Sequence, residues 1–308
     1  MIFVTQGHEH SIGLEVFIKS FLLINYHAQK DFLLFCTKNS LKKTLQSLNI
    51  KFSLADNYTL LSNTKLNCNF VENDVMSETL STLEKALEVI SEKDILLTLP
   101  SSKEQFFYQN KHNRGYTEFL RNKFNSKNLA MGFYYKNTLF NLITDHIPLN
   151  KVSESITQKK IISKTINTIT GFNKYFKKID EIYFSGINPH AGENGLLGNE
   201  EERIKESIIH LQAAYPQIKI SGPYSGDVII KKRDQSKVQI FTFFHHDQGL
   251  GIFKAINQYF GINITFGLPF LRMSVDHGTA FDLYKKNKAN YLGCLYMLKT
   301  ASKIHLNI

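Results

Sequence analysis

Apolar runs alternate with amphipathic stretches along the chain. The runs "IFVT" (2–5), "DFLLFCT" (31–37) and "DILLTLP" (94–100) are typical of buried strands, whereas "SETLSTLEKALEVISEK" (77–93) places apolar residues every three or four positions, as an amphipathic helix does. The same criteria predict further strands over 129–135, 137–145, 179–187 and 237–244, and further helices over 14–24, 40–48, 117–124, about 153–177, 199–215 and after Asp276. Strands that alternate with helices favour a mostly parallel sheet covered by helices.

Polar side chains follow several of these predicted strands, where ligand sites of open α/β sheets usually lie. They are Asp145 and His146, then Asn188, His190 and Glu193, then His245, His246 and Asp247, with Asp227 in a nearby loop. Histidines on three strand ends suit a divalent metal ion, because neutral imidazole is a common ligand of such ions. A single histidine in an apolar context is more often a hydrogen-bonded core residue, so a structural role stays open for each one.

Two further segments could bind an anion. The segment "NPHAGENGLLGNEE" has Gly192, Gly195 and Gly198, which permit unusual backbone conformations, and it leads into a helix beginning near Asn199. In "GINITFGLPFLRMSVDHGTAFDL", Arg272 lies within an apolar run and needs a carboxylate or phosphate partner, either in the protein or on a ligand. We expect Gly278, Thr279 and Ala280 to open a helix.

Several common nucleotide-binding and nucleophile motifs are absent from the sequence. It has no GxGxxG dinucleotide fingerprint, no GxxxxGK[ST] phosphate loop and no GxSxG nucleophile elbow. A standard Rossmann, P-loop or serine hydrolase site is therefore not supported.

Composition and charge narrow the class of protein. The chain has 308 residues, 43% of them hydrophobic, enough for one large domain or two smaller ones. Its net charge of +10 comes mainly from scattered lysines, without an arginine-rich run, so we expect a solvated surface that favours anionic substrates and no nucleic-acid partner. Three widely spaced cysteines, no secretory signal and no apolar membrane span predict a cytoplasmic protein without membrane contact.

Seven segments, taken together, resemble the 4-hydroxythreonine-4-phosphate dehydrogenase family of vitamin B6 synthesis. They occur in the family's order from Gly7 to about Leu283: "SIGLE", "LTLPSSK", "GYTEFL", "DHIPLNKV", "GINPHAGENGLLGNEE", "HHDQGLGIFK" and "GINITFGLPFLRMSVDHGTAFDL". The resemblance implies an α/β fold like that of isocitrate and isopropylmalate dehydrogenases, with two α/β subdomains around a central cleft. Residues 1–110 and about 275–308 would form the first subdomain, and about 111–274 would form the second, which has most metal and substrate residues.

The resemblance also implies a site and a reaction. A divalent ion (zinc, magnesium or cobalt) would be held by His146, His190 and His246 in a homodimer whose active sites are shared at the interface. The substrate contacts would fall on Tyr116, Thr117, Lys254, Asn263 and Arg272, and the loop that receives the adenosine part of NAD or NADP on Asp276, His277, Gly278, Thr279 and Ala280. The implied reaction is oxidation of 4-phosphooxy-L-threonine at C3 with decarboxylation to 3-amino-2-oxopropyl phosphate. Its catalytic base is left open among Asp227, Asp247 and a lysine, with Lys254 as the candidate.

The sequence departs from the family pattern at several places. Tyr116 and Ser102 stand where histidine is common in the family, and the first loop, "TQGHEHSIG", differs from the usual "GEPAGIG". These departures concern the substrate more than the chemistry. The alternatives are a dehydrogenase for another phosphorylated hydroxy acid, such as 4-phosphothreonate or 4-phosphoerythronate, and a paralogue that binds metal and ligand without turnover.

Overall fold

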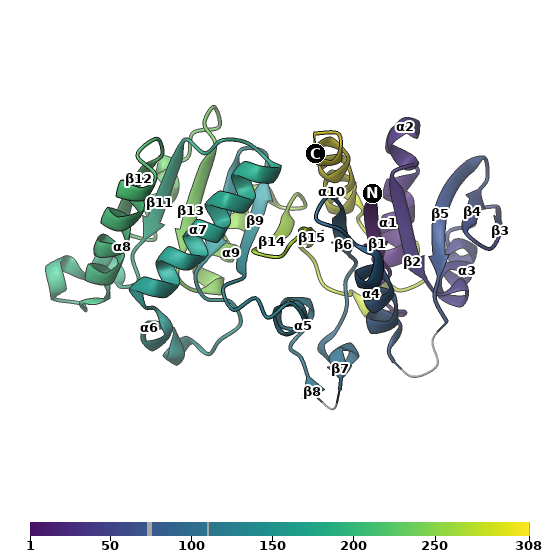
Figure 1. Ribbon diagram of the computed structural model, residues 1–308, viewed down its shortest axis with the longest axis horizontal. Coiled ribbons are helices and arrows are strands. Elements are labelled where there is room, and N and C mark those ends of the chain that lie inside the picture. The colour runs from purple at the N-terminus through teal and green to yellow at the C-terminus, as the bar shows by residue number, and fades with distance from the viewer. Residues whose placement is uncertain (73–75, 110, 308) are drawn as a thin grey trace. The chain divides into compact units, whose positions relative to one another are not determined.

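The computed structural model of the protein describes residues 1–72, 76–109 and 111–307. The chain forms two compact units (Figure 1). Unit 1 comprises Met1–Ser126, Tyr259–Ile262 and Leu268–Ile308, and unit 2 comprises Lys127–Gln258 and Asn263–Gly267. The first boundary between the units lies between residues 126 and 127, whereas the sequence predicted it between 110 and 111. Phe119 and Leu120 belong to unit 1 because they are buried in the same core as Phe3.

Unit 1 is built on a sheet in the order β15-β6-β1-β2-β5-β4-β3. Its elements along the chain are β1 (Ile2–Thr5), α1 (Gly13–Phe21), α2 (Tyr26–Gln29), β2 (Phe32–Cys36), α3 (Lys38–Ser47), β3 (Phe52–Leu54), β4 (Tyr58–Leu61), β5 (Thr64–Phe70), α4 (Glu78–Val89), β6 (Ile95–Thr98), β7 (Phe107–Tyr108), β8 (Lys111–His112), α5 (Tyr116–Lys123), β15 (Leu271–Val275) and α10 (Leu292–His305). The four strands β15, β6, β1 and β2 run parallel. The strands β3, β4 and β5, which pair antiparallel with one another, were not predicted. Strands β3 and β4 are too short to show a pattern, and the alternation of polar and apolar residues in β5 was overlooked.

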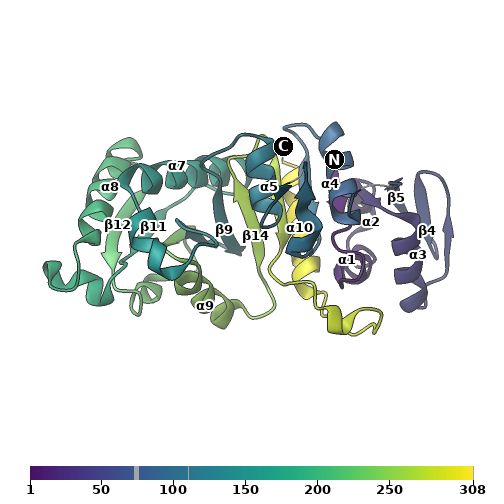
Figure 2. The ribbon, with the colours of Figure 1, turned by 90° about the horizontal axis from the view of Figure 1, so that it is seen from below.

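Unit 2 has a second sheet segment in the order β12-β11-β13-β10-β9-β14. Its elements are β9 (Ala130–Tyr135), β10 (Thr138–Leu142), α6 (Val152–Ser155), α7 (Gln158–Tyr175), β11 (Glu181–Ser185), α8 (Glu200–Ala214), β12 (Lys219–Tyr224), β13 (Gln239–Phe243), α9 (His246–Asn257) and β14 (Ile262–Phe266). Figure 2 shows α7 and α8 on one face of this sheet and α9 on the other. Strands β12, β11, β13 and β10 are parallel, which confirms the predicted mostly parallel sheet.

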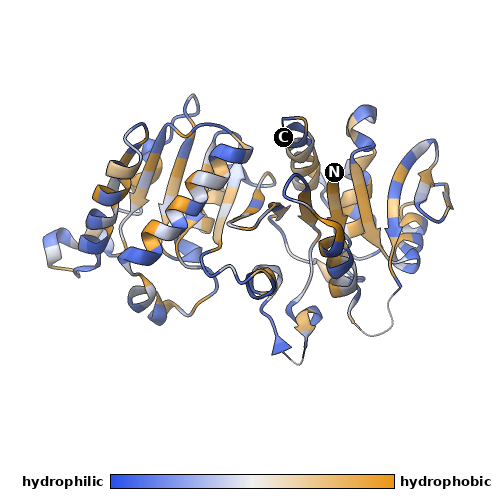
Figure 3. Cartoon of the chain, in the orientation of Figure 1, coloured by the Kyte–Doolittle hydropathy of each residue, from blue (hydrophilic) through white to orange (hydrophobic). Residues whose placement is uncertain are grey.

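Hydrophobic residues concentrate on the strands and on the inner faces of the helices (Figure 3). The core of unit 2 contains Phe140, Phe241 and Phe243 from adjacent strands, together with Phe253 from α9. Among the described residues, none of the helices has both the length and the apolar character needed to span a bilayer.

The predicted helix opening at Gly278, Thr279 and Ala280 was wrong. Ala280 has left-handed backbone angles (φ 45°, ψ 55°), and only a short 3-10 turn, Phe281–Leu283, follows before α10 begins at Leu292. Lys285 and Asn287 also have positive φ values, so the backbone of this segment does not continue into a helix.

Candidate functional site

Three neighbouring parallel strands of unit 2 end beside one another and lead into the predicted metal-binding histidines. Strand β13 lies between β10 and β11, with Leu142 of β10 paired to Phe243 of β13. His146 follows β10, His190 follows β11 and His246 begins α9 directly after β13. Because the carboxyl ends of parallel strands meet at one edge, these three side chains belong to the same edge of the unit 2 sheet.

His146 and His246 lie next to each other. Their ring centres are 5.2 Å apart. Asp145, which precedes His146, is 4.0 Å from the ammonium group of Lys164, a buried residue on α7. The loop after β10 is thus held to α7 by an ion pair and faces the start of α9.

His245 and Gln248 fix the turn between β13 and α9. Nδ1 of His245 accepts a hydrogen bond from the Gln248 backbone N–H at 3.3 Å, so His245 is the N-cap of α9. The Gln248 side chain accepts from the Phe244 N–H at 3.0 Å and donates to the Gly186 carbonyl at 2.8 Å, which joins this turn to the end of β11. Sequence reasoning had missed Gln248, although an amide in the first turn of a helix that follows a buried strand is a signal for such a bond.

His190 and His246 each contact a carboxylate through Nδ1. His246 is 2.8 Å from Asp247, and His190 is 2.5 Å from Glu193. If each Nδ1–H donates to its carboxylate, each Nε2 has a lone pair for a ligand, as in metal sites where a carboxylate orients the imidazole. The hydrogen bond to the Glu193 carboxylate raises the pKa of His190, and the bond with His246 lowers the pKa of Asp247.

The loop from Pro189 to Gly195, which holds His190, has an unusual backbone. Residues His190 to Asn194 all have positive φ values, between 42° and 79°, so the loop forms a left-handed turn. The buried carboxylate of Glu201, in the first turn of α8, accepts hydrogen bonds from the backbone N–H groups of Ile187 and Asn188. The loop is therefore tied to α8 from within unit 2.

The three predicted ligands do not meet in a single chain. Within the described ranges, the ligand atoms of His146, His190 and His246 do not form a group in which all lie within 4.8 Å of one another. The chemistry of the donors nevertheless fits a divalent ion, because two of the imidazoles are oriented by carboxylates and a third lies beside one of them.

The other predicted residues of unit 2 have different surroundings. Asp227 lies exposed in a turn, where a hydrogen bond from the Ser225 hydroxyl lowers its pKa, and its charge also acts on His190. Lys254 is exposed on α9. Asn263 is partly buried on β14, and its Oδ1 atom is buried without a hydrogen-bond partner among the described residues. A buried acceptor of this kind needs a donor, which a bound ligand can supply.

Arg272 and Tyr116 form a buried pair in unit 1. The Arg272 side chain is 3% exposed and donates through Nε and Nη2 to the Thr98 hydroxyl, at 3.2 and 2.6 Å. Its guanidinium lies 5.2 Å from the centre of the Tyr116 ring, and the Tyr116 hydroxyl donates to the Leu99 carbonyl at 2.9 Å. Burial lowers the pKa of Arg272 to about 10, which leaves it charged at neutral pH, whereas burial raises the pKa of Tyr116 and keeps the phenol neutral.

The predicted cofactor loop, residues 276–280, follows β15 in unit 1. The carbonyl of Thr279 accepts a hydrogen bond from the Ile12 N–H at 3.0 Å, so this loop contacts the loop after β1. Nδ1 of His277 lies 3.0 Å from the Gly278 carbonyl. The predicted residues are thus divided: Tyr116, Thr117, Arg272 and residues 276–280 belong to unit 1, and the others belong to unit 2.

Comparison with known families gives one match that covers most of the chain. A model of the "pyridoxal phosphate biosynthetic protein PdxA" family matches residues 26–301. Among curated proteins, a 4-hydroxythreonine-4-phosphate dehydrogenase of Aquifex aeolicus is 38% identical over 210 residues, which are 66% of this chain and 63% of that protein. A D-threonate 4-phosphate dehydrogenase of Salmonella typhimurium is 31% identical over 229 residues, 72% of this chain and 68% of that protein.

The chain matches the first curated relatives over slightly less than two thirds of their length, 63% and 65%. Solved structures, in contrast, resemble the chain over nearly its whole length. A crystal structure of 4-hydroxythreonine-4-phosphate dehydrogenase from Klebsiella pneumoniae has a TM-score of 0.77 at 25% identity and covers 99% of both chains. Isocitrate dehydrogenase from Methylococcus capsulatus has a TM-score of 0.52 at 11% identity, covering 99% of this chain and 85% of that one. The fold is therefore of the isocitrate dehydrogenase type, as predicted.

Proposed function

The chain belongs to the PdxA family of pyridoxal phosphate biosynthetic proteins, and from this membership we propose that it oxidises 4-phosphooxy-L-threonine at C3, with decarboxylation to 3-amino-2-oxopropyl phosphate. The electron acceptor would be NAD or NADP. The observation that supports this proposal most is the arrangement of His146, His190 and His246 after three adjacent parallel strands.

The three histidines would hold the divalent ion. Imidazole ligands favour zinc or cobalt over magnesium, which prefers oxygen ligands. Such an ion would lower the pKa of the substrate hydroxyl at C3 and, in the ketone product, would polarise the carbonyl in favour of decarboxylation. The three histidines do not meet within one chain. In a homodimer with shared active sites, histidines of both subunits would together complete each metal site.

Charged and polar side chains would orient the substrate. Arg272 is held by Thr98 and remains protonated, so it can bind a phosphate or carboxylate group, and Lys254 supplies a second cation. The unsatisfied Oδ1 of Asn263 can accept a hydrogen bond from the substrate, and Thr117 can donate one. The base that takes the hydroxyl proton would be Asp227, Asp247 or Lys254. Asp247 already contacts His246, and Asp227 already accepts a hydrogen bond from Ser225.

The assay is NAD(P)H formation by the purified full chain with 4-phosphooxy-L-threonine, NAD or NADP and a divalent metal. We expect turnover that a chelator abolishes and that zinc or cobalt restores. His246→Ala should lose at least a hundredfold in kcat/KM, whereas the matched change His27→Ala, at an exposed position on α2, should leave kcat/KM unchanged. Turnover that is equal with and without the chelator would contradict the metal-dependent mechanism.

The residue at position 116, Tyr116, favours an alternative substrate as the second candidate. Its hydroxyl is engaged with the Leu99 carbonyl and stays neutral, so it cannot supply the positive charge that a histidine there could offer to a phosphate. D-threonate 4-phosphate and 4-phosphoerythronate should therefore be assayed in parallel, the former being the substrate that the Salmonella relative's name gives. Activity on only one of these two compounds would show that the protein catalyses the oxidation of that compound instead. Tight metal and NAD binding without turnover of any of the three would indicate a non-catalytic paralogue.

A further inference from the structure

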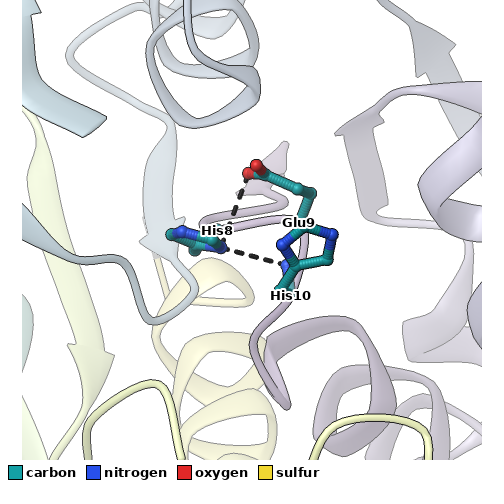
Figure 4. Close-up of side chains that lie close together, drawn as sticks. All are labelled: His8, Glu9 and His10. Carbon is teal, nitrogen blue, oxygen red and sulfur yellow. Dashed lines mark hydrogen bonds and ion pairs between the residues drawn. The ribbon is translucent and has the colours of Figure 1, made fainter. Parts of the chain in front are cut away.

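The loop after β1 gathers two histidines and a glutamate. The ligand atoms of His8, Glu9 and His10 all lie within 4.8 Å of one another, and this is the one such group of three found in the described residues (Figure 4). The loop belongs to unit 1, whereas His146, His190 and His246 belong to unit 2. None of the roles proposed above uses these three side chains.

The distances within the group suit a small divalent ion. Nδ1 of His8 lies 3.5 Å from Oε2 of Glu9. Two ligands that each lie about 2.1 Å from a tetrahedral ion are separated by about 3.4 Å. The His8 and Glu9 atoms are therefore already spaced as ligands, and the exposed His10 side chain can rotate to supply the third.

Glu9 provides a second, independent observation. Its Oε2 atom is buried and has no hydrogen-bond partner among the described residues. A carboxylate oxygen that is removed from water without a donor is unfavourable, and a cation compensates it. This oxygen faces Nδ1 of His8, and the ion would bind between these two atoms.

The loop is held in place by its surroundings. The His8 N–H donates to the Pro100 carbonyl at 2.9 Å, and the His8 carbonyl accepts from both the N–H and the hydroxyl of Ser11. The His8 ring packs edge-on against Phe281, with 4.8 Å between ring centres. Nε2 of His8 lies 3.8 Å from Glu104, which is placed to orient the imidazole as carboxylates do in metal sites. A site held in this way needs little rearrangement to bind an ion.

We propose that His8, Glu9 and His10 bind one ion of the zinc class, with the fourth position open to water or an anion. Imidazole and carboxylate donors favour zinc, cobalt, nickel or copper over magnesium. The ion replaces the 3.0 Å hydrogen bond that Nδ1 of His8 accepts from the His10 N–H. The site does not depend on the proposed enzymatic function, and its test separates the two.

The first experiment is equilibrium dialysis of chelator-treated full-length protein against Zn²⁺. The His246→Ala variant serves as the background, since it weakens the other predicted site. We expect one Zn²⁺ per chain in this background and at least tenfold weaker binding when Glu9→Gln and His10→Asn are added. The matched control makes the same chemical changes at exposed positions, Glu92→Gln and His27→Asn, and should bind as the background does. Circular dichroism melting curves verify that all variants are folded.

A second measurement locates the ion. His10 is exposed, so diethyl pyrocarbonate should modify it, and Zn²⁺ should protect it, as read by peptide mass spectrometry. Equal modification of His10 with and without Zn²⁺ overturns the proposal. So does equal Zn²⁺ affinity of the Glu9→Gln/His10→Asn variant and its matched control, or the absence of any bound Zn²⁺ in the His246→Ala background.

Discussion

Tyr116 makes contacts through two parts of its side chain, the ring and the hydroxyl. Its ring lies against the Arg272 guanidinium and makes a T-shaped contact with Phe106, with ring centres 4.8 Å apart, while its hydroxyl donates to the Leu99 carbonyl. A cation above an aromatic face is stabilised more strongly when water is excluded. Arg272 can therefore remain charged in a buried position, oriented by Thr98 on one side and by the ring on the other.

Tyr116→Phe should separate the contacts of the ring from the hydrogen bond of the hydroxyl. The ring face stays, but the Leu99 carbonyl loses its donor, so we expect the free energy of unfolding to fall by about 1 kcal/mol. Tyr116→Ala also removes the ring and should cost about 3 kcal/mol. Urea denaturation measures both values. Tyr26→Phe is the control, because the Tyr26 side chain is 76% exposed, and it should change nothing. Equal losses in the two phenylalanine variants would show that the Tyr116 hydroxyl bond adds no stability.

Residue patterns predicted some features of the site and not others. The polar clusters at three strand ends could be found because each follows an apolar run that is visible in the sequence, whereas the choice of His146, His190 and His246 as ligands rests on the family resemblance. Glu201 and Gln248 could not, because their roles depend on partners that the fold brings together, such as Gly186 in the loop after β11. The bond between Thr98 and Arg272 joins residues 174 positions apart and has no local signal.

At the scale of elements, the left-handed turn before α8 depends on Gly192. Its φ is 79°, and a Cβ atom at this position would lie 2.6 Å from Oε2 of Glu201. The Glu201 carboxylate is the group that accepts the backbone N–H bonds of Ile187 and Asn188. A side chain at residue 192 would therefore disturb both the turn and its anchor.

Gly192→Ala should lower the free energy of unfolding by about 1–3 kcal/mol, through backbone strain and displacement of Glu201. Gly251→Ala is the matched change. Gly251 lies within α9, where an added Cβ meets nothing within 4 Å, so it should stabilise the protein by about 0.5–1 kcal/mol. Both values follow from thermal or urea denaturation. A Gly192→Ala variant as stable as the parent would mean that the turn can be formed without glycine.

Element prediction from the sequence succeeded where apolar periodicity was strong. Strands β1, β2 and β6 and helices α4 and α8 were expected from their patterns, and the structure confirms them. The predicted helix over about 153–177 is divided into α6 and α7, because Thr157 adopts an extended conformation and caps α7 by accepting from the Lys160 N–H. Strands β3 and β4 span only three and four residues, too few for a clear pattern. In β5, Leu66 and Cys68 alternate with polar residues, a strand signal that sequence reasoning missed.

At the scale of the whole molecule, the free energy of unfolding should depend on pH through carboxylates that accept several hydrogen bonds in the folded state. Burial alone would raise the pKa of Glu181, but hydrogen bonds from Lys237, Gln239 and Tyr183 outweigh it and lower the pKa to about 2. Hydrogen bonds from Ser153 and Asn188 lower the pKa of Glu200 to about 2 as well. A carboxylate whose pKa is lower in the folded than in the unfolded state stabilises the fold above its unfolded pKa. That stability is lost as the pH falls toward the folded value.

Glu181→Gln should therefore flatten the acid limb of the stability curve. The parent should lose stability from about pH 4.5 down to about pH 2, and the variant should lose less over this window. Near pH 7 the variant should be less stable by about 1–3 kcal/mol, since buried donors lose a charged acceptor. Urea denaturation at a series of pH values measures this. Glu206→Gln, exposed on α8, should follow the parent curve, and a Glu181→Gln curve parallel to the parent's would contradict the assignment.

The order of the chain through the two units has a consequence for synthesis on the ribosome. Unit 2 is nearly continuous, whereas unit 1 is completed by Leu268–Ile308, which supply β15 beside β6 and helix α10 against α1. At about 5–20 residues per second, β6 and α1 wait about ten seconds or more for these partners to leave the ribosome. The first unit to be translated is thus the last to finish folding, and its exposed apolar strands are the part of the nascent chain that most needs a chaperone.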